Sequence, residues 1–147
     1  MPDAEAEKVP AAYLAHLAAL GPALPDVARR LATEVSLHDA LLRGVERKKG
    51  RLELLFRAGN QQTGYFDAML EYEGAEIADA EALVLQNALG RQDVELLSDE
   101  FDSHESGWSH TLLFWGPSRG TYQEVAVTFS AVSLRLFPAP GRFEERS

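Results

Sequence analysis

The chain has 147 residues, 46% of them hydrophobic and 25% charged, which is the composition of one ordinary globular domain. Its formal charge of -9 disfavours nucleic acid and anionic membranes as partners, because both are bound mainly through lysine and arginine. The absence of cysteine excludes disulfides, thiol nucleophiles and cysteine-ligated zinc. With no apolar run that could span a bilayer and no signal-peptide pattern, we expect a cytoplasmic protein.

The N-terminal part, residues 1–36, has the residue pattern of two helices. The first is predicted after Pro10 and ends at Gly21, and the second is predicted from about Pro25. Four apolar residues recur at helical intervals along the first one: Tyr13, Leu14, Leu17 and Leu20.

From residue 40 the hydrophobic period changes to two. Residues 40–73 predict a three-stranded antiparallel meander, and residues 77–90 predict a helix. Residues 93–137 predict a second β-run, with the turn GPSRG inside it, and residues 138–147 predict an irregular tail. Strands are expected in this second run near 93–102, 108–115, 121–130 and 132–137, of which the last two could be one strand bent at Ser130.

This order of elements predicts a single α+β domain over residues 1–147. We expect an antiparallel sheet of about six or seven strands. Two N-terminal helices and one helix inserted between the two β-runs would accompany it.

One stretch, VELLSDEFDSHESGWSHTLLFWG from Val94 to Gly116, holds the densest group of chemically useful side chains. It does not match a calcium-binding EF-hand loop, since His104 stands where that loop requires glycine. It also lacks HExxH zinc spacing. We therefore expect a β-hairpin with a charged tip. The candidate residues within it are Asp99, Glu100, Asp102, His104, Trp108, His110 and Trp115.

The register of this hairpin decides what His110 faces. A turn that closes with Ser103 opposite Gly107 puts Glu100 across from His110, whereas a loop one residue longer puts Phe101 there. The second register groups more aromatic surface on one face, made of Leu97, Phe101, Trp108, Leu112 and Phe114. Because burial outweighs an exposed ion pair worth about 0–1 kcal/mol, we predict the second register, which weakens an acid–base role for His110.

The two tryptophans, Trp108 and Trp115, are separated by an odd number of residues, so they cannot both face the same core. One of them is expected to be at least partly exposed and to be a candidate contact for a partner.

His38 and Asp39 form the other candidate pair. Metal-dependent phosphohydrolases use a helical His-Asp dyad, but here the surrounding pattern is β. A helix-to-strand junction, at which the aspartate binds backbone amides, explains the pair better. Motifs for serine nucleophiles and for phosphate-binding loops are absent. We therefore predict no catalytic residue, no cofactor and no metal site.

Several segments resemble a layout found in small, uncharacterised bacterial proteins. They are SLHDALLRGVERKKGRLELLFRAG, GYFDAMLEYEGAEI, VELLSDEFD, HTLLFWGP and VAVTFSAVSLRLFP, and together they cover about residues 36–137. The function of that group is unknown, and some acidic proteins of this build are similar to toxin-immunity proteins, which act by binding a partner. The resemblance transfers no functional residue to this chain.

The sequence therefore favours a non-enzymatic protein-binding domain, and its negative charge favours a basic protein partner. The expected contact region is the acidic stretch from Asp93 to Glu105 together with one exposed tryptophan. Homodimer formation is another alternative, since an exposed edge strand would allow it. The first alternative is a small-ligand-binding domain with an aromatic-lined pocket in a curved sheet. The second is a metal-assisted hydrolase that would use His38, Asp39, Glu100, His104 or His110.

Overall fold

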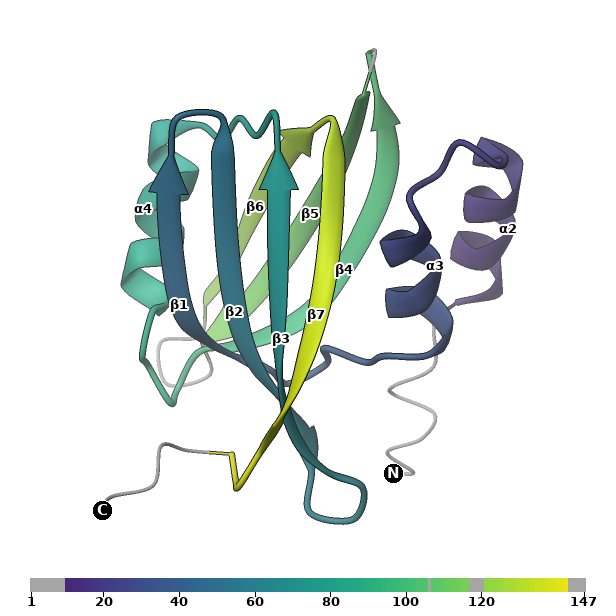
Figure 1. Cartoon of the computed structure of the whole chain (residues 1–147). Coiled ribbons are helices and arrows are strands. Elements are labelled where there is room, and N and C mark those ends of the chain that lie inside the picture. The colour runs from purple at the N-terminus through teal and green to yellow at the C-terminus, as the bar shows by residue number, and fades with distance from the viewer. Residues whose placement is uncertain (1–9, 106, 117–120, 143–147) are drawn as a thin grey trace.

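A computed structural model describes residues 10–105, 107–116 and 121–142, and these fold into two facing antiparallel sheets with three helices (Figure 1). This arrangement confirms the predicted α+β class, with seven strands, two N-terminal helices and one helix between the strand runs. The helices are α2 (Ala11–Leu20), α3 (Asp26–Thr33) and α4 (Asp79–Ala88). None of them is long and apolar enough to cross a membrane.

The seven strands are divided between a four-stranded and a three-stranded sheet. The larger sheet has the order β1-β2-β3-β7, with β1 at Leu41–Lys48, β2 at Arg51–Asn60, β3 at Gly64–Glu73 and β7 at Ala131–Ala139. The smaller sheet has the order β4-β5-β6, with β4 at Glu95–His104, β5 at Gly107–Gly116 and β6 at Thr121–Phe129. Strand β7 includes Pro138 and Ala139, which the sequence had placed in the tail. The predicted turn GPSRG lies outside the described residues except for Gly116.

The last β-run is two strands rather than one, because the chain changes sheets at Ser130. The Ser130 amide donates to the carbonyl oxygen of Glu73 at 2.8 Å, and its hydroxyl donates to the same oxygen. Gly74 lies beside this bend with φ +64°, and a Cβ there would come within 2.6 Å of the Ser130 hydroxyl. The end of β3 thus anchors the bend and directs β7 to pair with β3.

The core lies between the two sheets and is built from alternate residues of each strand. In β2 the even-numbered residues Leu52, Leu54 and Phe56 are at most 1% exposed. Phe56 stacks on Phe114 of the facing sheet, with ring centroids 6.4 Å apart. Contacts of this kind between aromatic and aliphatic side chains fill the interior, as the alternation of apolar residues along the strands predicts.

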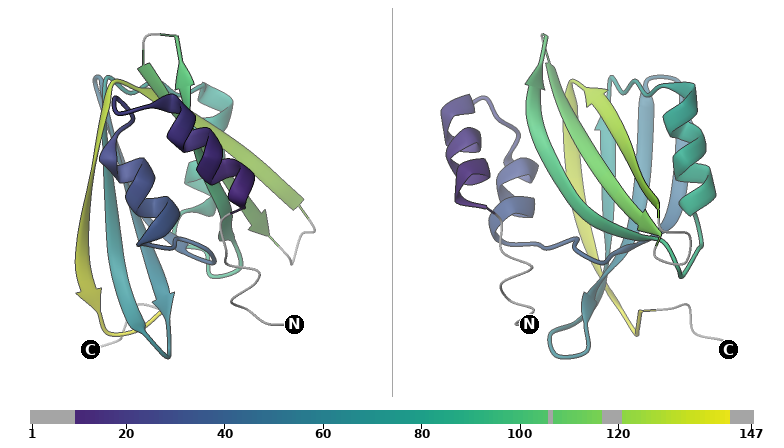
Figure 2. Two further views of the ribbon diagram at one scale, coloured as in Figure 1. Left: turned by 90° about the vertical axis from the view of Figure 1, so that its right-hand side faces the viewer. Right: turned by 180° about the vertical axis from the view of Figure 1, so that it is seen from behind.

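The helices cover the two open sides between the sheets (Figures 1 and 2). Helix α4 lies beside the β1 and β6 edges, whereas α2 and α3 lie beside the β4 and β7 edges. Leu85 and Ala88 are the buried residues of α4, and Leu17 and Leu31 are among those of α2 and α3. The two sides differ in how closely the helices pack against the sheet edges.

Candidate functional site

A cavity of about 730 Å³ lies between helices α2 and α3 and the edge of strand β4. This volume is within the range of small-molecule binding sites, about 300–1,000 Å³. The walls are mostly aliphatic: they include Leu14, Ala28, Leu31, Ala32, Val35 and Leu37. We call this cavity the β4 cleft.

Carboxylates supply the charge of the β4 cleft. Glu34, Asp99 and Glu100 line it, and within residues 10–105, 107–116 and 121–142 no lysine or arginine does. Glu34 is partly neutralised by Arg30, 3.8 Å away on the same helix, while Glu100 is exposed at the outer face of β4. A group that enters the cleft therefore meets apolar walls and an excess of negative charge.

Asp99 connects the β4 cleft to a buried polar network. Its Oδ2 lies 2.6 Å from Nε2 of His110, and Nδ1 of His110 lies 2.7 Å from the hydroxyl oxygen of Tyr72. His110 and Tyr72 are both fully buried, whereas 16% of the Asp99 side chain is exposed. The ring of Phe101 stacks on His110 with centroids 3.8 Å apart. The network thus runs from the cleft, through β5, to strand β3 of the other sheet.

Proton positions in this network follow from the acceptors and donors. A carboxylate can only accept, so Nε2–H of His110 donates to Asp99, and the hydroxyl of Tyr72 lies within hydrogen-bond distance of Nδ1. The pKa of Tyr72 is raised well above its usual value, first by burial and then by the negative charge of Asp99. Tyr72 therefore keeps its proton, and each ring nitrogen of His110 has a hydrogen-bond partner.

The hairpin register is the predicted one at its tip. Phe101 pairs with His110, so the prediction from burial is confirmed. A bulge between Leu96 and Ser98 then shifts the strand, so that Leu96 and not Leu97 pairs with Phe114.

The register that places Phe101 opposite His110 does not leave the histidine without a carboxylate partner. Asp99 lies two residues before Phe101 on the same face of β4, and it reaches His110 diagonally. The comparison of directly opposite residues missed this diagonal contact.

The remaining acidic and histidine candidates of the hairpin are dispersed. Asp102 is exposed and lies 2.9 Å from Nε2 of His16 on helix α2. His104 lies at the tip, 3.7 Å from Glu105. In the described residues no group of three or more histidine and acidic side chains could hold a metal ion.

The two tryptophans lie on opposite faces of β5, as their spacing predicts. Trp108 is partly buried against the core. Trp115 faces outward and stacks on the exposed ring of Tyr122, with centroids 4.2 Å apart.

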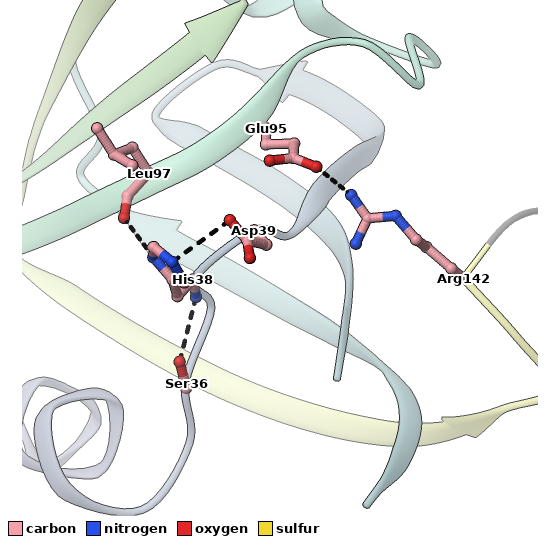
Figure 3. A network of polar contacts seen from close by, with 6 residues as sticks. All are labelled: Ser36, His38, Asp39, Glu95, Leu97 and Arg142. Carbon is pink, nitrogen blue, oxygen red and sulfur yellow. Dashed lines mark hydrogen bonds and ion pairs between the residues drawn. The ribbon is translucent and has the colours of Figure 1, made fainter. Parts of the chain in front are cut away.

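His38 and Asp39 belong to a second polar cluster at the start of β1 (Figure 3). Nδ1–H of His38 donates to the carbonyl oxygen of Leu97 at 2.9 Å, and Nε2 lies 3.4 Å from Oδ1 of Asp39. Ser36, rather than Asp39, accepts a backbone amide at this junction. Asp39 has φ +68°, a left-handed conformation that aspartate tolerates better than most residues, and its amide donates to the Leu96 carbonyl.

Glu95 completes this second cluster by pairing with Arg142 (Figure 3). Burial and then the nearby charge of Asp39 raise the pKa of Glu95, while Arg142 opposes the shift. The cluster joins β4, the β1 junction and the chain after β7. Ser36 and His38 line the cleft, whereas Asp39, Glu95 and Arg142 do not, so the charged part of the cluster lies beside the cleft.

Tyr13 and His16 are site residues that sequence reasoning missed. The hydroxyl oxygen of Tyr13 accepts the amide of Phe101 at 2.6 Å, which ties α2 to the edge of β4. Burial is the main cause that raises the pKa of Tyr13 to about 12. Tyr13 was recognised only as an apolar helix position, and its hydroxyl was the signal that could have indicated a polar contact.

The structure therefore brings Asp99, Glu100 and His38 to one cleft and connects Asp99 to His110. It places Asp102, His104, Trp108, Trp115 and Asp39 outside the lining of that cleft. No protein-family model, no curated protein and no solved structure matches the chain.

Proposed function

We propose that this chain is a non-enzymatic binding domain that takes a basic segment of a partner protein in the β4 cleft. The observation that carries the proposal is the lining of the cleft, which among the described residues combines aliphatic walls with three carboxylates and contains no lysine or arginine. Such a surface attracts a positively charged partner over a distance and retains it through apolar contact.

The buried network supports binding over acid–base catalysis. His110 is fully buried, and both of its ring nitrogens are engaged, one by Asp99 and one by Tyr72. A general base must reach the proton that it removes, and no histidine nitrogen of this network is open to the cleft. Asp99 is the one member of the network that borders the cleft.

The test is capture of protein partners on the immobilised chain. Proteins retained by the wild type should be released by moderate salt, because the contact is electrostatic. They should be lost on Glu100→Lys, which reverses a charge in the cleft. Glu124→Lys makes the same change at an exposed position of β6 and should retain them. Equal retention by Glu100→Lys and Glu124→Lys would show that the cleft is not the contact region.

A second candidate function is the binding of a small cationic molecule, which the cleft volume of about 730 Å³ favours. In that case the chain should capture no protein. Instead, a screen of small amines should raise the melting temperature of the wild type and not that of Glu100→Lys.

A further inference from the structure

Asp99 lines the β4 cleft, and its two carboxylate oxygens differ in their partners. Its Oδ2 is held by His110, whereas no hydrogen bond from another described residue reaches Oδ1. Most of the side chain is buried, with 16% exposed, and the exposed part borders the cleft. A partly desolvated carboxylate oxygen of this kind interacts more strongly with a cation than one at the open surface.

The buried network fixes the direction of that oxygen. His110 is held on one side by stacking against Phe101 and on the other by the Tyr72 hydroxyl, so the carboxylate of Asp99 has a rigid hydrogen-bond donor behind it. His110 and Tyr72 are thus positioning residues for Asp99. A pre-oriented carboxylate loses little side-chain freedom when it binds a ligand.

The residues two positions before and after Asp99 on β4 have backbone groups that are bound by side chains from outside the sheet. On one side Nδ1–H of His38 donates to the carbonyl oxygen of Leu97, and on the other side the Tyr13 hydroxyl accepts the amide of Phe101. Asp99 lies between them, beside the aliphatic walls that include Leu31 and Val35.

We propose that Asp99 anchors one guanidinium or ammonium group of the partner's basic segment, whose neighbouring apolar side chains lie against the aliphatic walls of the β4 cleft. This inference rests on the proposed function and names the chemistry that the cleft recognises. It requires no other contact between the two proteins, so it can be tested with short peptides.

The probes are two end-blocked tripeptides, Leu-Arg-Leu and Leu-citrulline-Leu, which differ only in the charge of the central side chain. Titration of the full wild-type chain, followed by amide chemical shifts, should show shifts in β4 and in α2 and α3 with the arginine peptide. The citrulline peptide should bind about tenfold or more weakly, since it lacks the charge-assisted hydrogen bond. This comparison needs no variant of the protein.

The matched variants are Asp99→Asn and Asp102→Asn, which make the same change on one strand. Asparagine at position 99 can still accept from Nε2–H of His110, so the network and the fold should be retained. Asp99→Asn should abolish the preference for arginine over citrulline, and Asp102→Asn, whose side chain is outside the cleft lining, should keep it.

The inference is overturned by equal binding of the two peptides, by shifts located away from the cleft, or by an Asp99→Asn variant that keeps the preference. Each of these outcomes leaves the proposed function standing if Glu100→Lys still releases a captured partner. If instead the peptides discriminate while no partner is captured, the anchor stands and the proposed function falls.

Discussion

The two open sides of the sandwich are covered in different ways. Helix α4 closes its side by direct packing, with Leu85 fully buried and its Glu81 carboxylate accepting the amide of Ala126 at 2.8 Å. Helices α2 and α3 cover the opposite side but leave the β4 cleft between themselves and the sheet edge. There α2 also makes polar contacts with β4, from Tyr13 to Phe101 and from His16 to Asp102.

The difference separates a side that is filled by packing from a side that contains a cleft. A packed helix removes apolar surface from water. A cleft leaves aliphatic side chains in contact with solvent and therefore contributes less to folding. The cleft side also holds the carboxylate that is oriented from within the core. The predictions below test this contrast, beginning with the largest expected effect.

Truncation of a leucine should cost more under α4 than at the cleft. Leu85→Ala should lower the free energy of unfolding by about 2–5 kcal/mol, because it opens a cavity in a packed region. Leu31→Ala should fall at the lower end of that range, since the lost atoms border space that is already empty. Urea denaturation of both variants measures the difference. Equal costs would mean that α3 packs as tightly as α4 does.

Removal of the Tyr72 hydroxyl tests the network that connects the cleft to the core. Tyr72→Phe leaves the buried Nδ1 of His110 without a donor and should cost about 1–3 kcal/mol in denaturant unfolding. Tyr122→Phe is the matched control, since that residue is 61% exposed, and its cost should be close to zero. If the two variants are equally stable, the hydroxyl of Tyr72 is not a required partner.

Local patterning was enough to predict the elements and the hairpin tip. The helical spacing in the N-terminal part and the alternation in the strands gave elements close to the observed bounds, because burial controls both. The pairing of Phe101 with His110 followed from the same argument. The division of the strands into two sheets did not, because it depends on the bend at Ser130 and on its contacts with the end of β3.

The site was harder to predict because its members come from distant parts of the chain. Tyr72 and His110 are 38 residues apart and lie in different sheets, and Tyr13 and Phe101 are 88 residues apart. The sequence contains no local pattern that indicates either contact. Asp99 was among the candidates, but its role depends on a diagonal contact that pairwise register does not describe.

A smaller effect is expected from the polar contact that joins α2 to β4. Tyr13→Phe removes the acceptor of the Phe101 amide and should cost about 0.5–1.5 kcal/mol. Hydrogen exchange of that amide should become faster, while exchange of the Ala126 amide under α4 should not change. Faster exchange at both amides would indicate a global rather than a local loss.

The burial of Tyr13 should make the stability of the fold sensitive to alkali. The pKa of Tyr13 is raised to about 12 by burial, so the stabilisation linked to its proton is fully present below pH 10.0 and is lost as the pH rises through about 12. A spectrophotometric titration should find one tyrosine that ionises near this value in the wild type and not in Tyr13→Phe. An unchanged titration curve would contradict the assignment.

The smallest effect is expected at Asp102, the exposed end of the contact with α2. Its pKa is lowered mainly by the hydrogen bond with His16 and further by the amide of Ser103. A lowered folded pKa means that the linked stabilisation is present above pH 3.8 and is lost as the pH falls through the folded value. Since the side chains of His16 and Asp102 are 45% and 57% exposed, solvent screening limits the effect to a few tenths of a kcal/mol.

Asp102→Asn should therefore reduce the acid sensitivity of unfolding slightly, and salt should reduce it in the wild type as well. Urea midpoints at several pH values between neutral and about pH 3 measure this, with Glu124→Gln as an exposed control on the far strand of the same sheet. If Asp102→Asn cost as much as Tyr13→Phe, the exposed ion pair would contribute as much as the half-buried hydroxyl. The α2 side would then be held by surface charge, and its cleft would widen or close with ionic strength, unlike the packed side under α4.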